Sequence, residues 1–154
     1  MFTILPKFLA VTVCLLLFPA TTLAQNNGID PPVDGNILEV TDQEVTFSDG
    51  YRTLLDIRYP TTSPNPGGWP MVLFVHSSGT SRTQVNGKAK SMAKRGYITV
   101  TYDVRGQGPG MALNNAQVHG RSNIGIRERI DMFETIEAVE ALFPSVVDMD
   151  RIGV

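Results

Sequence analysis

The chain has 154 residues, of which 42% are hydrophobic, and a formal net charge of −2. This length indicates one domain at most. Charges of both signs are scattered along the chain and form no basic stripe, which argues against a nucleic-acid partner. The single cysteine, Cys14, lies in the amino-terminal apolar run, so the rest of the chain needs no disulfide.

Residues 1–24 have the layout of a secretory signal peptide. Lys7 gives a short positive region, residues 8–18 form an apolar run, Pro19 breaks it, and residues 22–24 offer a cleavage site. The run is shorter than the roughly 20 apolar residues of a membrane span. We therefore expect a cleaved signal, a secreted or periplasmic protein and no stable membrane span, with an uncleaved membrane anchor as the alternative. Residues 25–36, rich in Gly, Pro and polar residues, are expected to form a flexible leader.

The first folded unit is expected to be a β-hairpin. Residues 45–47 and 55–59 alternate between apolar and polar side chains, and Ser48-Asp49-Gly50 lies between them as a tight-turn signal. The continuous apolar run 71–75 is typical of a strand covered on both faces, as in a parallel sheet. A helical pattern over 84–95, with Ala89, Met92 and Ala93 on one side, is expected to end at Gly96.

The second half repeats this alternation of strands and helices. Residues 97–102 predict a strand, residues 103–124 a long connection of the kind that is usually functional or mobile, and residues 126–142 an amphipathic helix. We expect its buried face to carry Ile126, Ile130, Phe133, Ile136, Val139 and Leu142, and its solvent face to carry Arg127, Glu128, Asp131, Glu134 and Glu137. A last strand is expected to begin at Arg151. The order of elements predicts the α/β class, with ligands at the carboxyl ends of the parallel strands.

Three segments carry a resemblance to a known family. His76-Ser77-Ser78-Gly79 follows the first buried strand, Asp103-Val104-Arg105-Gly106-Gln107-Gly108 follows the next, and Asp150-Arg151-Ile152-Gly153-Val154 opens the last. In order and spacing they resemble the α/β-hydrolase superfamily, nearest its X-Pro dipeptidyl-peptidase-like and acyl-peptidase-like branches, over residues 43–154. The resemblance implies that residues 37–154 form a partial α/β-hydrolase domain. This would be the amino-terminal half of the sheet, an antiparallel hairpin and then parallel strands with flanking helices, ending before the nucleophile elbow.

The resemblance also implies roles for individual residues. In that superfamily the loop after the first buried strand typically reads His-Gly-x-Gly and supplies a backbone N–H to the oxyanion hole. By position Ser77 and Ser78 are the oxyanion-hole candidates, and His76 braces the loop. Ser77 stands where glycine is usual, which would be strained if that position required positive φ. The alternative is a loop that only caps the next helix. Asp103 and Arg105 are expected to bond local backbone and fix the second turn.

Other kinds of site fit the sequence less well. A dinucleotide loop at 106–110 would have its third glycine one residue early and needs a helix immediately afterwards, which the sequence does not predict. No residues are spaced as metal ligands, so we expect no metal and no cofactor. His119 lies on a polar loop, where solvation is expected. A flavodoxin-like binding module would need a phosphate-binding loop that the sequence lacks.

The implied function is that of a secreted serine hydrolase acting on ester or peptide/amide bonds. Its substrate would be a small-molecule ester or peptide. None of the Ser-Asp-His triad is present among these residues, because in that superfamily the triad lies beyond the point that this sequence reaches. We therefore expect no activity from these residues alone. The alternative is a truncated, non-catalytic binding module with an α/β-hydrolase-like fold.

Overall fold

The computed structural model describes residues 35–64, 66–115 and 125–154. The predicted signal peptide, nearly all of the predicted leader and His119 lie outside these residues. The described chain forms β1 (Ile37–Thr46), β2 (Arg52–Pro60), β3 (Trp69–Val75), the 3₁₀ helix η1 (Arg82–Val85), α1 (Asn86–Ala93), β4 (Ile98–Tyr102), the 3₁₀ helix η2 (Pro109–Leu113), α3 (Ile126–Leu142) and β5 (Val147–Gly153). The predicted α/β class is confirmed.

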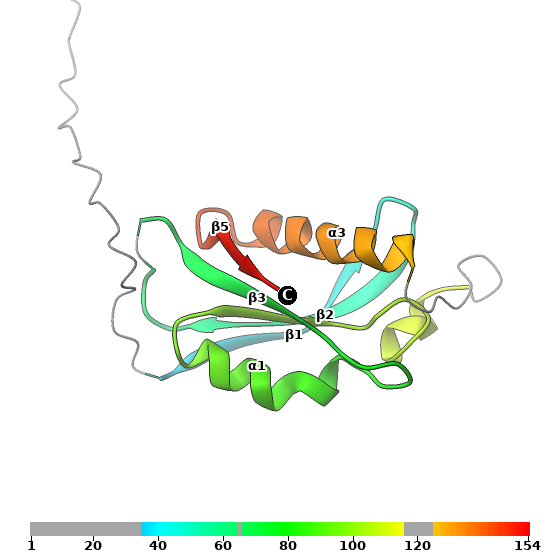
Figure 1. Ribbon diagram of the computed structural model, residues 1–154, viewed down its shortest axis with the longest axis horizontal. Coiled ribbons are helices and arrows are strands. Elements are labelled where there is room, and N and C mark those ends of the chain that lie inside the picture. The colour runs from blue at the N-terminus through cyan, green and yellow to red at the C-terminus, as the bar shows by residue number, and fades with distance from the viewer. Residues whose placement is uncertain (1–34, 65, 116–124) are drawn as a thin grey trace, which may run out of the picture.

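The five strands form one mixed sheet in the order β1-β2-β4-β3-β5. β1 pairs with β2, and β2 with β4, in antiparallel fashion, whereas β3 pairs in parallel fashion with both β4 and β5. Helix α3 lies on one face of the sheet and α1 on the other, and β5 forms one edge (Figure 1). Because β3 and β4 are parallel, their carboxyl ends lie at the same end of the sheet, which brings the loops that follow them together.

The hairpin is confirmed with the predicted turn. The N–H of Phe47 donates to the carbonyl of Tyr51, and the N–H of Gly50 donates to the carbonyl of Phe47, which closes the chain around Ser48-Asp49-Gly50. The predicted 84–95 helix begins as η1 and continues as α1, with Ala89 and Ala93 fully buried against the sheet.

The buried core lies on the α3 face of the sheet. Because successive side chains of a strand point to opposite faces, alternate residues of β2, β3 and β4 gather there with Ile136 and Val139 of α3. The core cluster is made by Leu55, Ile57, Trp69, Met71, Leu73, Ile98, Val100, Tyr102, Val104, Ile136, Val139 and Val147.

The predicted orientation of the 126–142 helix is wrong in part. Its bounds are as predicted, but Ile126 and Phe133 are 69% and 66% exposed, and Leu142 is exposed as well. Glu128 and Asp131, predicted to face solvent, are buried. The reason is an ion pair between Asp131 and the buried Arg105, which turns that side of the helix toward the sheet.

The last strand begins earlier than the sequence predicts. β5 starts at Val147, opposite Trp69, and its register shifts before Ile152 pairs with Met71. Asp148, Asp150 and Arg151 of this irregular stretch are polar, so a hydrophobic pattern does not detect the start of the strand. Arg151 bonds the carboxylate of Asp148 and the carbonyl of Gly68 and so closes the bulge.

Candidate functional site

A cleft of about 480 Å³ lies where β3 and β4 end. It is lined by the loop after β3, the turn after β4 and the first turn of α3. Residues on its wall include the predicted His76, Ser77 and Ser78, as well as Tyr102, Gln107 and Met132. The volume lies within the range of about 300–1,000 Å³ usual for small-molecule sites. The structure thus brings the predicted loop residues to one cleft.

His76 joins the loop after β3 to the turn after β4. Its Nε2 accepts the N–H of Val104 at 3.0 Å, and its Nδ1 lies 2.9 Å from the carbonyl oxygen of Ser77. Because an acceptor nitrogen carries no proton, the ring is neutral with its proton on Nδ1, which donates to Ser77. The imidazole is buried and both nitrogens are engaged by backbone. His76 is therefore built as a brace between two loops and not as a general base.

The backbone N–H groups of the loop are used unequally. The N–H of Ser77 donates to Oε1 of Gln84 at 3.1 Å, and the N–H of Gly79 donates to Oε1 of Gln107 at 2.6 Å. The N–H of Ser78, between them, has no hydrogen-bond partner among the described residues. Of the two oxyanion-hole candidates, Ser78 is thus the one with a backbone donor still available.

Serine at position 77 causes no backbone strain. The residues with positive φ include Gly79, at 80°, but neither Ser77 nor Ser78. The tight bend of the loop is therefore made at Gly79, where a residue without Cβ adopts this conformation at little cost. Ser77 is not the cap of η1, whose N-cap residue is Ser81; its N–H and its hydroxyl both donate to the side chain of Gln84.

Asp103 organises the turn after β4. One carboxylate oxygen accepts the N–H of Arg82 at 2.9 Å, and the other accepts both Nη1 of Arg82 at 2.6 Å and the N–H of Gly110 at 2.9 Å. A Cβ at Gly108, whose φ is 63°, would lie only 2.3 Å from the Asp103 carboxylate. The second glycine of the motif is therefore required by the close approach of Asp103.

The same geometry weighs against a dinucleotide loop at 106–110. A short helix, η2, does follow Gly108 directly, contrary to the sequence prediction. The N–H of Gly110 is nevertheless taken by Asp103, whose buried negative charge lies where a phosphate would have to approach.

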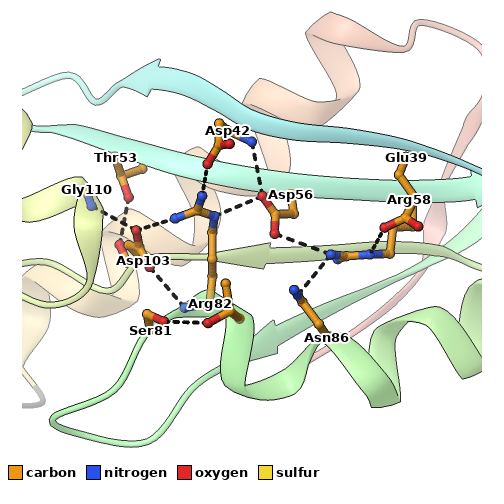
Figure 2. A network of polar contacts seen from close by, with 11 residues as sticks. Glu39, Asp42, Thr53, Asp56, Arg58, Ser81, Arg82, Asn86, Asp103 and Gly110 are labelled. Carbon is orange, nitrogen blue, oxygen red and sulfur yellow. Dashed lines mark hydrogen bonds and ion pairs between the residues drawn. The ribbon is translucent and has the colours of Figure 1, made fainter.

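Arg82 is the centre of a buried ion network that the sequence did not reveal (Figure 2). Its guanidinium donates to Asp42, to Asp56 at 2.9 Å and to Asp103 at 2.6 Å, so one cation joins β1, β2 and the turn after β4. Burial alone would raise the pKa of the Asp56 carboxyl, but the hydrogen bonds from Arg82 and from the N–H of Asp42 hold it below its usual range. The network therefore joins η1 and the turn after β4 to strands β1 and β2.

Arg105 reaches across to α3 and does not bond the local backbone. It donates two bonds to Asp131, at 2.9 and 2.7 Å, pairs with Asp49 at 3.0 Å and lies over the ring of Tyr51, 4.2 Å from its centre. Burial alone would lower the pKa of Arg105, but these two carboxylates raise it. Arg105 therefore docks α3 and the hairpin turn onto the site.

Within residues 35–64, 66–115 and 125–154 no three His, Cys, Asp or Glu side chains gather as metal ligands. In the same residues no helix is long and apolar enough to cross a membrane. Gln84, Gln107 and Arg82 are the site residues that sequence reasoning missed. Gln107 alone carried a signal, because it occupies the variable position of the Asp-x-Arg-Gly-x-Gly turn.

No family model matches this sequence, and no curated protein matches it. Solved structures do match its fold. The α/β hydrolase GrgF from a Penicillium species superimposes with a TM-score of 0.55 and 17% identity, over 76% of this chain and 36% of its own. An acetyl xylan esterase from a Paenibacillus species gives 0.53 and 18%, over 79% and 45%. Esterase B from Lactobacillus rhamnosis gives 0.51 and 19%, over 79% and 35%.

These similarities define the fold of the described residues. Their mixed sheet and flanking helices form part of an α/β-hydrolase fold, as the motif order predicts. The chain spans between 35% and 45% of the length of these three solved structures. At such low identity the similarity shows architecture, and the chemistry must be argued from the cleft.

Proposed function

We propose that this chain is the amino-terminal part of a secreted serine hydrolase that cleaves ester or peptide/amide bonds, related to the X-Pro dipeptidyl-peptidase-like branch. The observation that carries the proposal is the available Ser78 N–H, on a braced loop that lines a cleft at the carboxyl end of β3. Acyl transfer needs such a donor about 3 Å from the developing oxyanion. The signal-like segment 1–24 supports secretion.

The sheet register supports a position for the nucleophile. Gly153 of β5 pairs with Val72, three residues before β3 ends at Val75. A strand that continued β5 in parallel would reach the level of Val75 within about three residues, given the equal rise of paired strands. A nucleophile elbow directly after such a strand would place its serine beside the loop 76–79. The triad histidine and acid would then follow further along the chain.

The substrate of the whole enzyme would be a small-molecule ester or a peptide. The cleft wall combines the apolar Val75, Val104 and Met132 with the polar Ser78 and Gln107. Such a wall suits an acyl group whose carbonyl points at the loop. The described residues need neither metal nor cofactor for this chemistry, which uses backbone donors and a protein nucleophile.

Two measurements test the proposal. The first is the sequence of the encoding transcript past codon 154, where we expect a G-x-S-x-G elbow, followed by an acid and a histidine. A stop codon there would favour the non-catalytic binding module instead. The second is an assay of purified residues 25–154 with p-nitrophenyl acetate and an X-Pro p-nitroanilide, where we expect no turnover. Turnover that tracked the pure protein and survived Ser77→Ala and Ser78→Ala would contradict the proposal.

A further inference from the structure

Two loops from neighbouring strands are joined into one unit at the cleft. His76, on the first loop, accepts the N–H of Val104 on the second, and Gln107, on the second, accepts the N–H of Gly79 on the first. Gln84 of η1 closes the first loop from the other side. Its Oε1 accepts the N–H and the hydroxyl of Ser77 and the hydroxyl of Thr80, at 3.0–3.1 Å.

The two glutamines select one donor from three consecutive backbone N–H groups. Gln84 takes the N–H of Ser77, Gln107 takes the N–H of Gly79, and the N–H of Ser78 has no partner in the part of the chain that the structure describes. Backbone donors in native proteins nearly always find an acceptor from protein or water, so an available N–H beside a cleft is suited to an acceptor supplied by a ligand.

The placement of Gln107 follows from the turn that carries it. The N–H of Gln107 donates to the carbonyl of Val104, and the preceding N–H, of Gly106, donates to the hydroxyl of Tyr51. The glycine that follows, Gly108, packs directly on Asp103. The Gln107 backbone is therefore fixed on both sides. Its side-chain oxygen Oε1 accepts the N–H of Gly79, on the neighbouring loop, at 2.6 Å.

We propose that Gln84 and Gln107 are positioning residues that hold Ser77 and Gly79, so that, of these three loop residues, Ser78 alone presents its N–H to the oxyanion of the reaction. The role of the Ser78 N–H in catalysis rests on the proposed function. The hydrogen bonds of the two glutamines to the loop do not depend on it. Neither glutamine touches the reacting atoms, and each acts through the loop. The Asp-x-Arg-Gly-x-Gly turn then has a second task besides closing β4, because it supplies one of the two side chains that orient the oxyanion loop.

Amide hydrogen exchange, measured by NMR on the full chain, tests the geometry without requiring activity. We expect the Ser78 amide to exchange at least about tenfold faster than those of Ser77 and Gly79, since hydrogen-bonded amides exchange only on opening. Gln107→Ala should accelerate exchange at Gly79 about tenfold or more, and Gln84→Ala should do so at Ser77. Gln107→Glu keeps an acceptor oxygen and should restore protection at Gly79.

Gln43→Ala is the matched control, because Gln43 is also a glutamine with a hydrogen bond of its own, to the Glu44 carbonyl on β1. It should leave the exchange of all three loop amides unchanged. Equal protection of Ser77, Ser78 and Gly79, or a Gly79 rate that Gln107→Ala does not alter, would overturn the proposal.

Steady-state kinetics of the gene product that carries the nucleophile test whether Gln107 positions the oxyanion loop for catalysis. Removing an oxyanion donor lowers kcat by about 10²–10³-fold. A positioning residue should cost less, so we expect Gln107→Ala to lower kcat about tenfold with KM nearly unchanged, and Gln107→Glu to recover most of it. A changed KM with an unchanged kcat would overturn the assignment. Absence of any turnover in the unaltered product would refute the proposed function, while the exchange data still decide the loop geometry.

Discussion

On the α3 face of the sheet the inward side chains of β2, β3 and β4 are apolar except for Thr53, whereas on the α1 face the corresponding side chains of β2 and β4 are polar or charged. Leu55 and Ile57 of β2 lie opposite Tyr102 and Val100 of β4, and all four belong to the core cluster. The residues between them on the other face are Asp56, Arg58, Thr99 and Thr101, all buried. The same two strands thus supply two kinds of interior.

This difference indicates how the molecule divides its tasks. Apolar packing under α3 is non-directional and stabilises the sheet in proportion to the area removed from water. The ion network on the other face is directional, because each carboxylate must meet a particular guanidinium nitrogen. Arg82 thereby fixes the position of the turn at Asp103 relative to β1 and β2 (Figure 2). The loops of the cleft are held mainly by the polar face.

The largest expected effect breaks the polar face. Arg82→Met leaves the buried carboxylates of Asp56 and Asp103 without their shared cation. Removing one partner of a buried pair costs about 3–5 kcal/mol, so we expect a loss of that size in the free energy of unfolding. Urea denaturation followed by circular dichroism measures it. Lys90→Met, which removes an exposed ion pair with Glu39, is the control and should cost less than about 1 kcal/mol.

Leu73→Ala gives the comparison on the apolar face. Removing a buried leucine side chain costs about 2–5 kcal/mol. The two losses should differ in their dependence on pH, although they are similar in size. Acid should diminish the effect of Arg82→Met, since protonated Asp56 no longer needs the guanidinium, and should leave that of Leu73→Ala unchanged. Equal pH dependence for the two variants would show that the faces do not differ as described.

The elements of the apolar face are those that the sequence predicts best. The run 71–75 and the alternation in β2 and β4 are hydrophobic patterns, and such patterns report burial directly. The orientation of α3 is predicted wrongly in part because its periodicity places Asp131 among the solvent-facing charges. A buried carboxylate depends on its partner, Arg105, which is 26 residues away in the sequence. Periodicity carries no information about such a pair.

The residues of the candidate site likewise fall into those that the sequence predicts and those that depend on contacts between distant segments. His76, Ser77, Ser78 and Asp103 were found from the sequence because they stand in motifs of recognisable order. Whether Ser77 or Ser78 offers the donor is not written in the motif. It depends on amide oxygens that come from η1 and from the turn after β4. Side-chain acceptors of this kind become visible only when the loops are placed side by side.

Asp56 and Asp131 are expected to have a smaller effect on stability. The pH dependence of this effect is opposite for the two groups, which lie on different faces of the sheet. Arg82 holds the pKa of Asp56 below its usual range, whereas burial, with the like charges of Asp49 and Glu134, raises the pKa of Asp131 despite its bonds to Arg105. Asp56 therefore contributes stability above its unfolded pKa of about 4, which is lost as the pH falls through its lower folded pKa. The contribution of Asp131 is present at low pH and is lost as the pH rises through its raised folded pKa.

Carboxyl carbon shifts recorded by NMR during an acid titration measure this difference. We expect Asp131 to take up its proton at a higher pH than Asp56. Arg82→Met should raise the midpoint of Asp56 and leave that of Asp131 in place, because Arg82 bonds only the first of these two carboxylates. Coincident midpoints, or a midpoint of Asp56 that does not respond to the substitution, would contradict the assignment of the shift to Arg82.

The smallest effect concerns Tyr102, whose hydroxyl lies in the apolar cluster. The Tyr102 hydroxyl is buried and has no hydrogen-bond partner among the described residues, and burial raises its pKa. Leaving a buried hydroxyl unbonded costs about 1–3 kcal/mol, and removing it relieves that cost. We therefore expect Tyr102→Phe to be neutral or to stabilise the chain by about 1 kcal/mol in urea denaturation. Thr53→Val, which removes a buried hydroxyl that does bond the Asp103 carbonyl, should instead destabilise it. A loss for Tyr102→Phe as large as that for Thr53→Val would mean that the Tyr102 hydroxyl, like that of Thr53, makes a hydrogen bond that stabilises the fold.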